Sequence, residues 1–150
     1  MIYCMDTSAF IRLDRDYSRE VFPSLWDDFI ITLVNESRLI ATEEVKEELK
    51  RKDDDLFKWV KNHCSGMFIK TETKILTRVN EIMGRFPNLV DPNNPTHNQA
   101  DPFVIALALE TQNILPGIEQ DTEIMVITYE KSIPGTLMAP KCRIFADIII

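Results

Sequence analysis

Glycine and cysteine are both scarce in this sequence, with 4 and 3 residues among 150. No segment matches G-x-x-x-x-G-K-[ST], in which a glycine-rich loop surrounds the phosphates of a nucleotide, so a loop of that kind is not expected. Cys4, Cys64 and Cys142 are odd in number, widely scattered, and form no C-x-x-C pair. We therefore expect buried free thiols rather than a disulfide framework or a zinc site.

Long hydrophobic runs are absent as well. No window approaches the roughly 20 apolar residues that a membrane-spanning helix needs. The apolar opening, residues 2–5, meets Asp6 at once and is too short for the apolar region of a secretory signal. We expect a cytoplasmic protein that makes no contact with membranes.

Basic residues are outnumbered by acidic ones, 17 to 24, and the formal net charge is −7. This balance argues against tight, non-specific binding of nucleic acid through a broad basic face, because neutralising phosphates requires Lys and Arg. It does not exclude a nuclease. Carboxylates that bind Mg²⁺ contribute to the negative total, and the bound ions reverse the local sign of the charge.

Segments typical of strands alternate with segments typical of helices. Short apolar runs predict strands at 2–5, 38–41, 67–69, 124–128 and 147–150. Helical spacing of apolar residues, together with capping signals, predicts helices at 21–34, 43–52, 55–63, 73–86, 101–110 and 140–145. Residues 87–98, rich in proline and asparagine, predict a loop. The alternation predicts one α/β domain over 1–150, in which helices cover both faces of a central parallel sheet.

Two of the predicted helices are expected to contribute strongly to the core. The segment 101–110 is apolar almost all round, which is typical of a helix buried between other elements. In the helix 21–34, the aromatic residues Phe22, Trp26 and Phe29 are expected to pack in the core rather than against a partner protein.

Four acidic residues fall where a parallel α/β sheet binds ligands, beyond the carboxyl ends of its strands. Asp6 follows the first strand and Glu130 lies two residues past the strand 124–128. Glu48 is on the helix after the second strand, and Asp101 begins the buried helix. Converging carboxylates repel one another unless a cation holds them, and Mg²⁺ and Mn²⁺ favour such oxygen ligands. The four acids could therefore form a divalent-metal site.

Each acid also has a simpler interpretation. Asp6 could cap the helix that follows it, and Asp101 before a proline has the form of an N-cap. Glu48 could belong to an exposed row with Glu44 and Lys52 at helical spacing, and Glu130 could be an ordinary loop charge. From composition and spacing alone, the chain is an α/β domain whose acids could hold a metal.

Four segments resemble the motifs of PIN-domain proteins. They are 3–11 (YCMDTSAFI), 42–49 (TEEVKEEL), 100–108 (ADPFVIALA) and 128–130 (TYE), and their order and spacing match that family across nearly the whole chain. Within it, the chain most resembles a group of stand-alone microbial PIN-like proteins. These share 21–26 (VFPSLW) and a Cys-Arg-x-Phe segment, here 142–145.

The resemblance implies a three-layer PIN-like fold and a Mg²⁺- or Mn²⁺-dependent ribonuclease. The catalytic and metal-binding residues that it implies are Asp6, Glu48, Asp101 and Glu130, with Glu44 as a further ligand. Glu130 departs from the family pattern, in which Asp is common. The register of the second motif also leaves Glu47 open in place of Glu48. Thr7, Ser8 and Thr128 are expected to hydrogen-bond these carboxylates and fix their orientation.

The resemblance also implies partners. The chain is similar to VapC toxins, so we expect an RNA substrate, an antitoxin protein that covers the site, and a homodimer. One alternative is a non-catalytic PIN-fold module that binds RNA or a partner protein. A phosphatase of the haloacid-dehalogenase type is disfavoured, because Ser8 stands where that family has a second aspartate.

Overall fold

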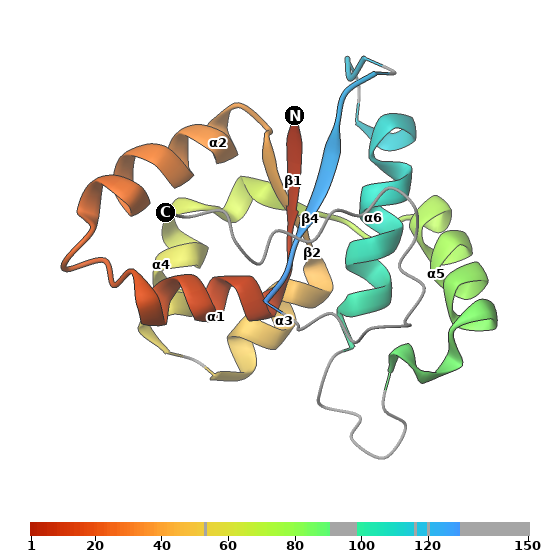
Figure 1. The fold of residues 1–150 in the computed structure, drawn as a ribbon, viewed down its shortest axis with the longest axis horizontal. Helices are drawn as coiled ribbons and strands as arrows, with labels where there is room; N and C mark the ends of the chain where they lie inside the picture. The colour runs from red at the N-terminus through yellow and green to blue at the C-terminus, as the bar shows by residue number, and fades with distance from the viewer. Residues whose placement is uncertain (53, 91–98, 116, 120, 130–150) are drawn as a thin grey trace.

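The computed structural model describes residues 1–52, 54–90, 99–115, 117–119 and 121–129. Within these residues the sheet has four strands: β1 Ile2–Met5, β2 Leu39–Thr42, β3 Phe68–Ile69 and β4 Ile124–Ile127. Their order is β3-β2-β1-β4, and every pairing is parallel. Tyr3 of β1 lies between Leu39 of β2 and Met125 of β4. The first strand of the chain is therefore central, and its carboxyl end has a strand on each side (Figure 1).

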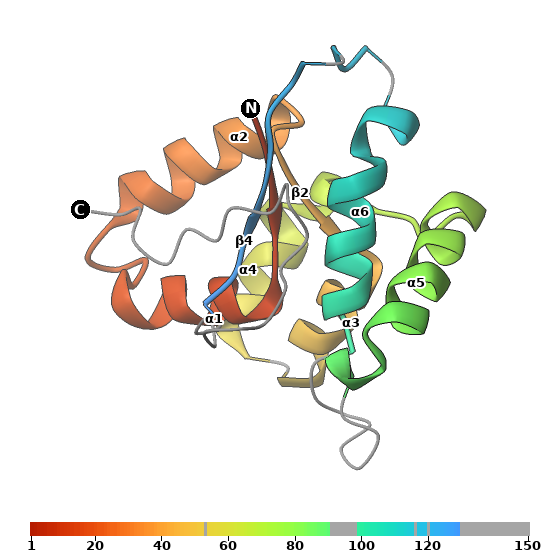
Figure 2. The same cartoon turned by 45° about the vertical axis from the view of Figure 1, so that its right-hand side comes forward.

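Helices cover both faces of this sheet, as the sequence predicts. They are α1 Thr7–Asp16, α2 Ile31–Asn35, α3 Glu43–Lys52, α4 Asp55–His63, α5 Thr73–Arg85 and α6 Asp101–Ile114. Helices α1, α2 and α4 lie on one side of the sheet, while α6 lies on the other with α5 packed against it (Figures 1 and 2). The α/β fold with a parallel sheet between two helical layers is confirmed.

Local signals account for several helix boundaries. Asp54 caps α4 by accepting a hydrogen bond from the Phe57 amide at 3.0 Å, and Thr42 accepts one from the Val45 amide at 3.4 Å at the start of α3. Helix α3 has acidic residues in its first turn and basic residues in its last, which suits the helix dipole. Helix α6 contacts β1, β2 and β4 and is largely buried, as its composition predicts.

The helix predicted at 21–34 differs from the expectation. It begins at Ser24 as a π-helix, η1 Ser24–Ile30, and continues directly into α2. Trp26 is fully buried and donates its indole N–H to the carbonyl of Tyr17 at 2.6 Å. Phe22 and Phe29 are 43% and 57% exposed, so placing them in the core was wrong. Only the narrow side of η1 that carries Trp26 and Ile30 is buried.

Cys4 and Cys64 are buried, as predicted, and Cys142 lies outside the described residues. Part of the predicted loop is a short 3-10 helix, η3 Pro87–Leu89, and a second one, η2 Ser65–Met67, precedes β3. The predicted elements 140–145 and 147–150 lie outside the described residues. In the part of the chain that the structure describes, none of the helices has both the length and the apolar character needed to span a membrane.

Candidate functional site

Asp6 lies at the carboxyl end of the central strand, where β1 turns into α1. Its backbone N–H donates to the carbonyl of Ile127 in β4 at 2.9 Å. Its side chain is 5% exposed and caps α1, accepting bonds from the Ser8 amide at 3.3 Å and the Ser8 hydroxyl at 2.5 Å. The expected capping role is therefore confirmed. A cap and a site residue are compatible here, because capping fixes the carboxylate at the edge where ligands bind.

The predicted hydroxyl partners of Asp6 are present. The hydroxyl of Thr128, which follows β4, donates to Asp6 Oδ2 at 3.2 Å. The Ser8 and Thr128 hydroxyls lie 3.1 Å apart, and the Tyr129 amide donates to Ser8 Oγ at 3.0 Å. All the hydrogen bonds to the Asp6 side chain reach Oδ2, and Oδ1 receives none from the residues that the structure describes. The described donors therefore hold one of the two carboxylate oxygens.

Glu48 is the second acid of the site, and its carboxylate joins three elements. Oε2 accepts the Thr7 hydroxyl at 2.6 Å, and Oε1 accepts the backbone amides of Gln99 at 2.9 Å and Ala100 at 3.0 Å. The carboxylate on α3 thus holds the start of α1 and the start of α6. Glu48 does not belong to an exposed row of charges, so that simpler interpretation was wrong.

The two neighbouring glutamates of α3 point elsewhere. Glu47 is exposed and pairs with Lys50 at 3.2 Å, which places it at the surface. Of the two glutamates that the second motif left open, Glu48 is the one that reaches the starts of α1 and α6, and its role in a metal site stays a prediction. Glu44 is half-buried and accepts the Thr71 hydroxyl at 2.7 Å and 3.0 Å on its two oxygens. Glu44 is thus bound to the segment after β3, and its role as a metal ligand stays a prediction.

Asp101 is the first residue of α6 rather than its N-cap, so the N-cap role that the sequence suggested for it was wrong. The N-cap is Ala100, whose side chain cannot cap. The carboxylate of Glu48 instead accepts the amides of Gln99 and Ala100, immediately before the helix. Pro102 follows in the first turn, where its missing N–H costs nothing. Asp101 is therefore positioned by the same carboxylate that Thr7 orients.

Hydrogen bonds link three of the four predicted acids through the residues between them. Asp6 and Glu48 are joined through the adjacent residues Ser8 and Thr7, and Glu48 is joined to Asp101 through the start of α6. Glu130 lies outside the described residues. Among the residues described, no three Asp, Glu, His or Cys side chains are grouped closely enough to hold a metal by themselves. The convergence of all four acids stays a prediction.

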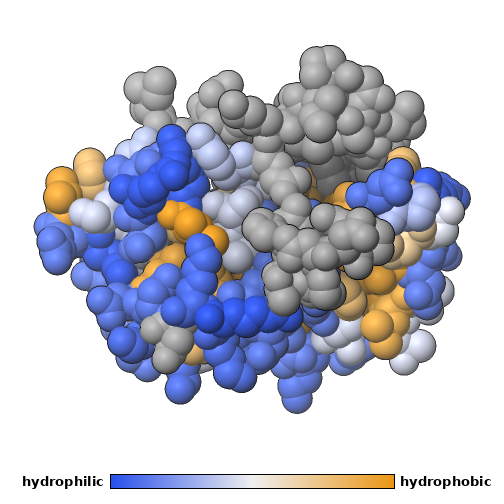
Figure 3. Space-filling model, turned by 90° about the horizontal axis from the view of Figure 1, so that it is seen from below, coloured by the Kyte–Doolittle hydropathy of each residue, from blue (hydrophilic) through white to orange (hydrophobic). Residues whose placement is uncertain are grey.

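The donor atoms at this edge suit a charged ligand. On the face seen from below in Figure 1, the described residues that remain in view are mostly hydrophilic, with apolar patches among them (Figure 3). Carboxylate and hydroxyl oxygens, which Asp6, Glu48, Thr7 and Ser8 provide, are the donors that Mg²⁺ and Mn²⁺ prefer. The chemistry of the donor set therefore fits the divalent cation that the resemblance implies.

Comparison with protein families assigns the chain to a family. A family model described as a domain of unknown function, DUF4411, matches residues 3–144. The chain belongs to this family. The matched span contains all four predicted acids, so the candidate site lies inside the DUF4411 domain. No curated protein and no solved structure matches the chain.

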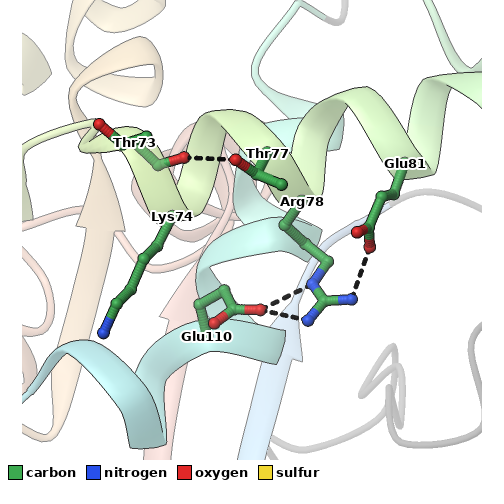
Figure 4. A pocket seen from close by; sticks show the side chains of 6 residues that line it. All are labelled: Thr73, Lys74, Thr77, Arg78, Glu81 and Glu110. Carbon is green, nitrogen blue, oxygen red and sulfur yellow. Dashed lines mark hydrogen bonds and ion pairs between the residues drawn. The ribbon is translucent and has the colours of Figure 1, made fainter.

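A second polar feature of this DUF4411 chain is a shallow pocket of about 220 Å³ between α5 and α6 (Figure 4). Arg78 donates through Nε to Glu110 at 2.7 Å and through Nη1 to Glu81 at 2.7 Å. Burial alone would raise the pKa of Glu110, but hydrogen bonds from Asn113 and Arg78 and the positive charge of Arg78 and Lys74 lower it overall. Glu110 raises the pKa of Arg78 in turn.

Sequence reasoning missed this ion pair. The signal was a glutamate at the end of an otherwise apolar helical segment, which indicates a buried charge that needs a partner. Glu110 is 6% exposed, and Arg78 lies 32 positions earlier in the sequence. The charges lining the pocket are satisfied mainly by one another. We interpret the feature as a connection between α5 and α6 rather than as a ligand site.

Proposed function

We propose that this DUF4411 protein is a Mg²⁺- or Mn²⁺-dependent endoribonuclease. One observation carries the proposal: the adjacent residues Thr7 and Ser8 bind the carboxylates of Glu48 and Asp6, respectively, at the carboxyl edge of the central strand. Acids held by hydroxyl groups in this way are typical of metal centres, where outer hydrogen bonds orient the ligands. The resemblance of the four acid motifs to PIN-domain ribonucleases supports the same chemistry.

In this proposal Asp6 and Asp101 hold the cation, together with Glu130 and water. When bound, the ion supplies water activation and neutralises charge at the phosphate. Ser8 and Thr128 orient the Asp6 carboxylate by donating to Oδ2. Glu48 fixes the first turn of α6 and so the position of Asp101. Phosphodiester hydrolysis of this type needs no histidine base.

The biological setting that we propose follows from the resemblance to VapC toxins. The protein would act in the cytoplasm as a toxin, as a dimer, and an antitoxin protein would cover its site. Expression alone would then arrest growth, and co-expression of the neighbouring gene would relieve the arrest. Growth that depends on neither gene would count against the toxin role without touching the nuclease proposal.

The nuclease proposal is tested with purified protein and total RNA, in Mn²⁺ and in EDTA. We expect cleavage by the wild type in Mn²⁺ only, and at least about a hundredfold loss in Asp6→Asn and Asp101→Asn, since a charged metal ligand is removed. Glu47→Gln, which alters an exposed acid of α3, is the matched control and should cut at the wild-type rate. Circular dichroism checks that each variant stays folded. Wild-type cleavage in Asp6→Asn, or cleavage that survives EDTA, would refute the proposal.

A non-catalytic binding module is the second candidate, and one observation favours it. Both oxygens of Glu48 already accept hydrogen bonds, three in total, so this acid is satisfied without a metal. Titration calorimetry with Mn²⁺ separates the two candidates. The nuclease predicts binding that Asp6→Asn abolishes, whereas the module predicts no heat of binding at millimolar Mn²⁺ for either protein.

A further inference from the structure

An arginine and a tyrosine form a cation–π pair beside the candidate site. The guanidinium carbon of Arg12 lies 4.3 Å from the centre of the Tyr129 ring. Tyr129 follows Thr128, and its amide donates to the same Ser8 hydroxyl that binds Asp6. Arg12 is one helical turn beyond Ser8 on α1, so both members of the pair are anchored to the residues that hold Asp6.

Much of the tyrosine remains available to a ligand. Tyr129 is 43% exposed although Arg12 lies over its ring. Arg12 also pairs with Asp16, and its side chain is 34% exposed. An exposed ring with a cation behind it resembles the surfaces on which nucleobases stack.

We propose that Arg12 and Tyr129 bind single-stranded RNA. An unpaired base stacks on the exposed part of the Tyr129 ring, and Arg12 supports the ring and offsets the charge of a neighbouring phosphate. The inference rests on the proposed ribonuclease function and adds how the substrate is held. It also explains how a chain with a net charge of −7 engages RNA, because stacking on an aromatic ring needs no broad basic face.

The test measures binding of a fluorescent single-stranded oligoribonucleotide to the full chain in EDTA, so that no cleavage occurs. We expect Tyr129→Leu to weaken binding about tenfold, the size of one lost stacking contact. Tyr129→Phe keeps the ring and should bind like the wild type. Arg12→Gln should weaken binding and reduce its dependence on salt. A duplex of the same sequence should be insensitive to Tyr129→Leu, because its bases are not free to stack.

The matched control is Arg19→Gln. Arg19 also lies over an aromatic ring, with its guanidinium carbon 5.6 Å from the centre of Trp26, but it follows the far end of α1. The Arg19→Gln substitution should leave RNA binding unchanged. In Mn²⁺, Tyr129→Leu should raise KM and leave kcat near the wild-type value, an outcome that mere loss of folded protein cannot produce.

The two proposals fail in different ways. Equal RNA binding by Tyr129→Leu and the wild type would overturn the role of the pair, and so would equal losses in Tyr129→Leu and Tyr129→Phe. Neither result bears on whether Asp6→Asn abolishes cleavage. Conversely, a wild type that binds the oligonucleotide through Tyr129 but never cuts RNA would refute the nuclease and sustain the stacking role.

Discussion

Replacing Glu48 with alanine tests how far one carboxylate holds the candidate site together. The substitution removes the acceptor of three hydrogen bonds. Their donors, the amides of Gln99 and Ala100 and the hydroxyl of Thr7, then lose this acceptor. A buried donor left unsatisfied costs about 1–3 kcal/mol. Water reaches the half-buried Glu48 position and replaces part of this loss, so we expect the free energy of unfolding to fall by about 3 kcal/mol.

The assay is equilibrium unfolding in urea at pH 7, followed by circular dichroism and fluorescence together. In thermal unfolding the same loss corresponds to a fall in Tm of roughly 6–12 °C for a chain of this length. Glu47→Ala is the control one position away, where an exposed pair with Lys50 contributes about 0–1 kcal/mol. If Glu48→Ala and Glu47→Ala unfold at the same urea concentration, Glu48 does not hold the start of α6, and the reasoning fails.

Two further predictions concern groups away from the site. Because Glu110 has a lowered pKa in the folded protein, its ion pair with Arg78 stabilises the fold at neutral pH, and this contribution is lost as the pH falls through the folded pKa. The stability difference between wild type and Glu110→Gln, measured in urea, should therefore shrink between pH 7 and pH 3, and a constant difference would contradict it. Burial raises the pKa of the Cys64 thiol to about 12, so Cys64 should resist alkylation at pH 8 until the chain unfolds, as peptide mass mapping would show. Rapid labelling of Cys64 in the folded protein would refute this.

Features with a local cause were predictable from the sequence. Helix α4 begins and ends at Asp55 and His63 as predicted, because a capping aspartate and the spacing of apolar residues act within a few positions. Strand β1 is a short apolar run that ends at a capping acid, and this pattern also placed Asp6. Fold class followed from the alternation of such elements, which leaves a parallel sheet as the arrangement that buries them all.

Features that depend on contacts between distant segments were not predictable in this way. The carboxylate of Glu48 binds amides 51 and 52 positions away, and no local pattern distinguishes it from an exposed glutamate such as Glu47. The exposure of Phe29 likewise depends on which side of η1 meets the sheet layer. Glu110 signalled a buried charge, but the identity of its partner depended on the packing of α5 against α6.

The hydrogen bonds also divide the acids by role. Asp6 has one oxygen bound by protein donors and one without a donor from the described residues, whereas both oxygens of Glu48 are occupied. A cation that approached Glu48 would have to compete with two backbone amides, and one that approached Asp6 would not. Asp6→Asn keeps an acceptor oxygen for Ser8 and Thr128, so it should remove activity at little cost in stability, while Glu48→Ala should change both, because Glu48 sets the position of Asp101.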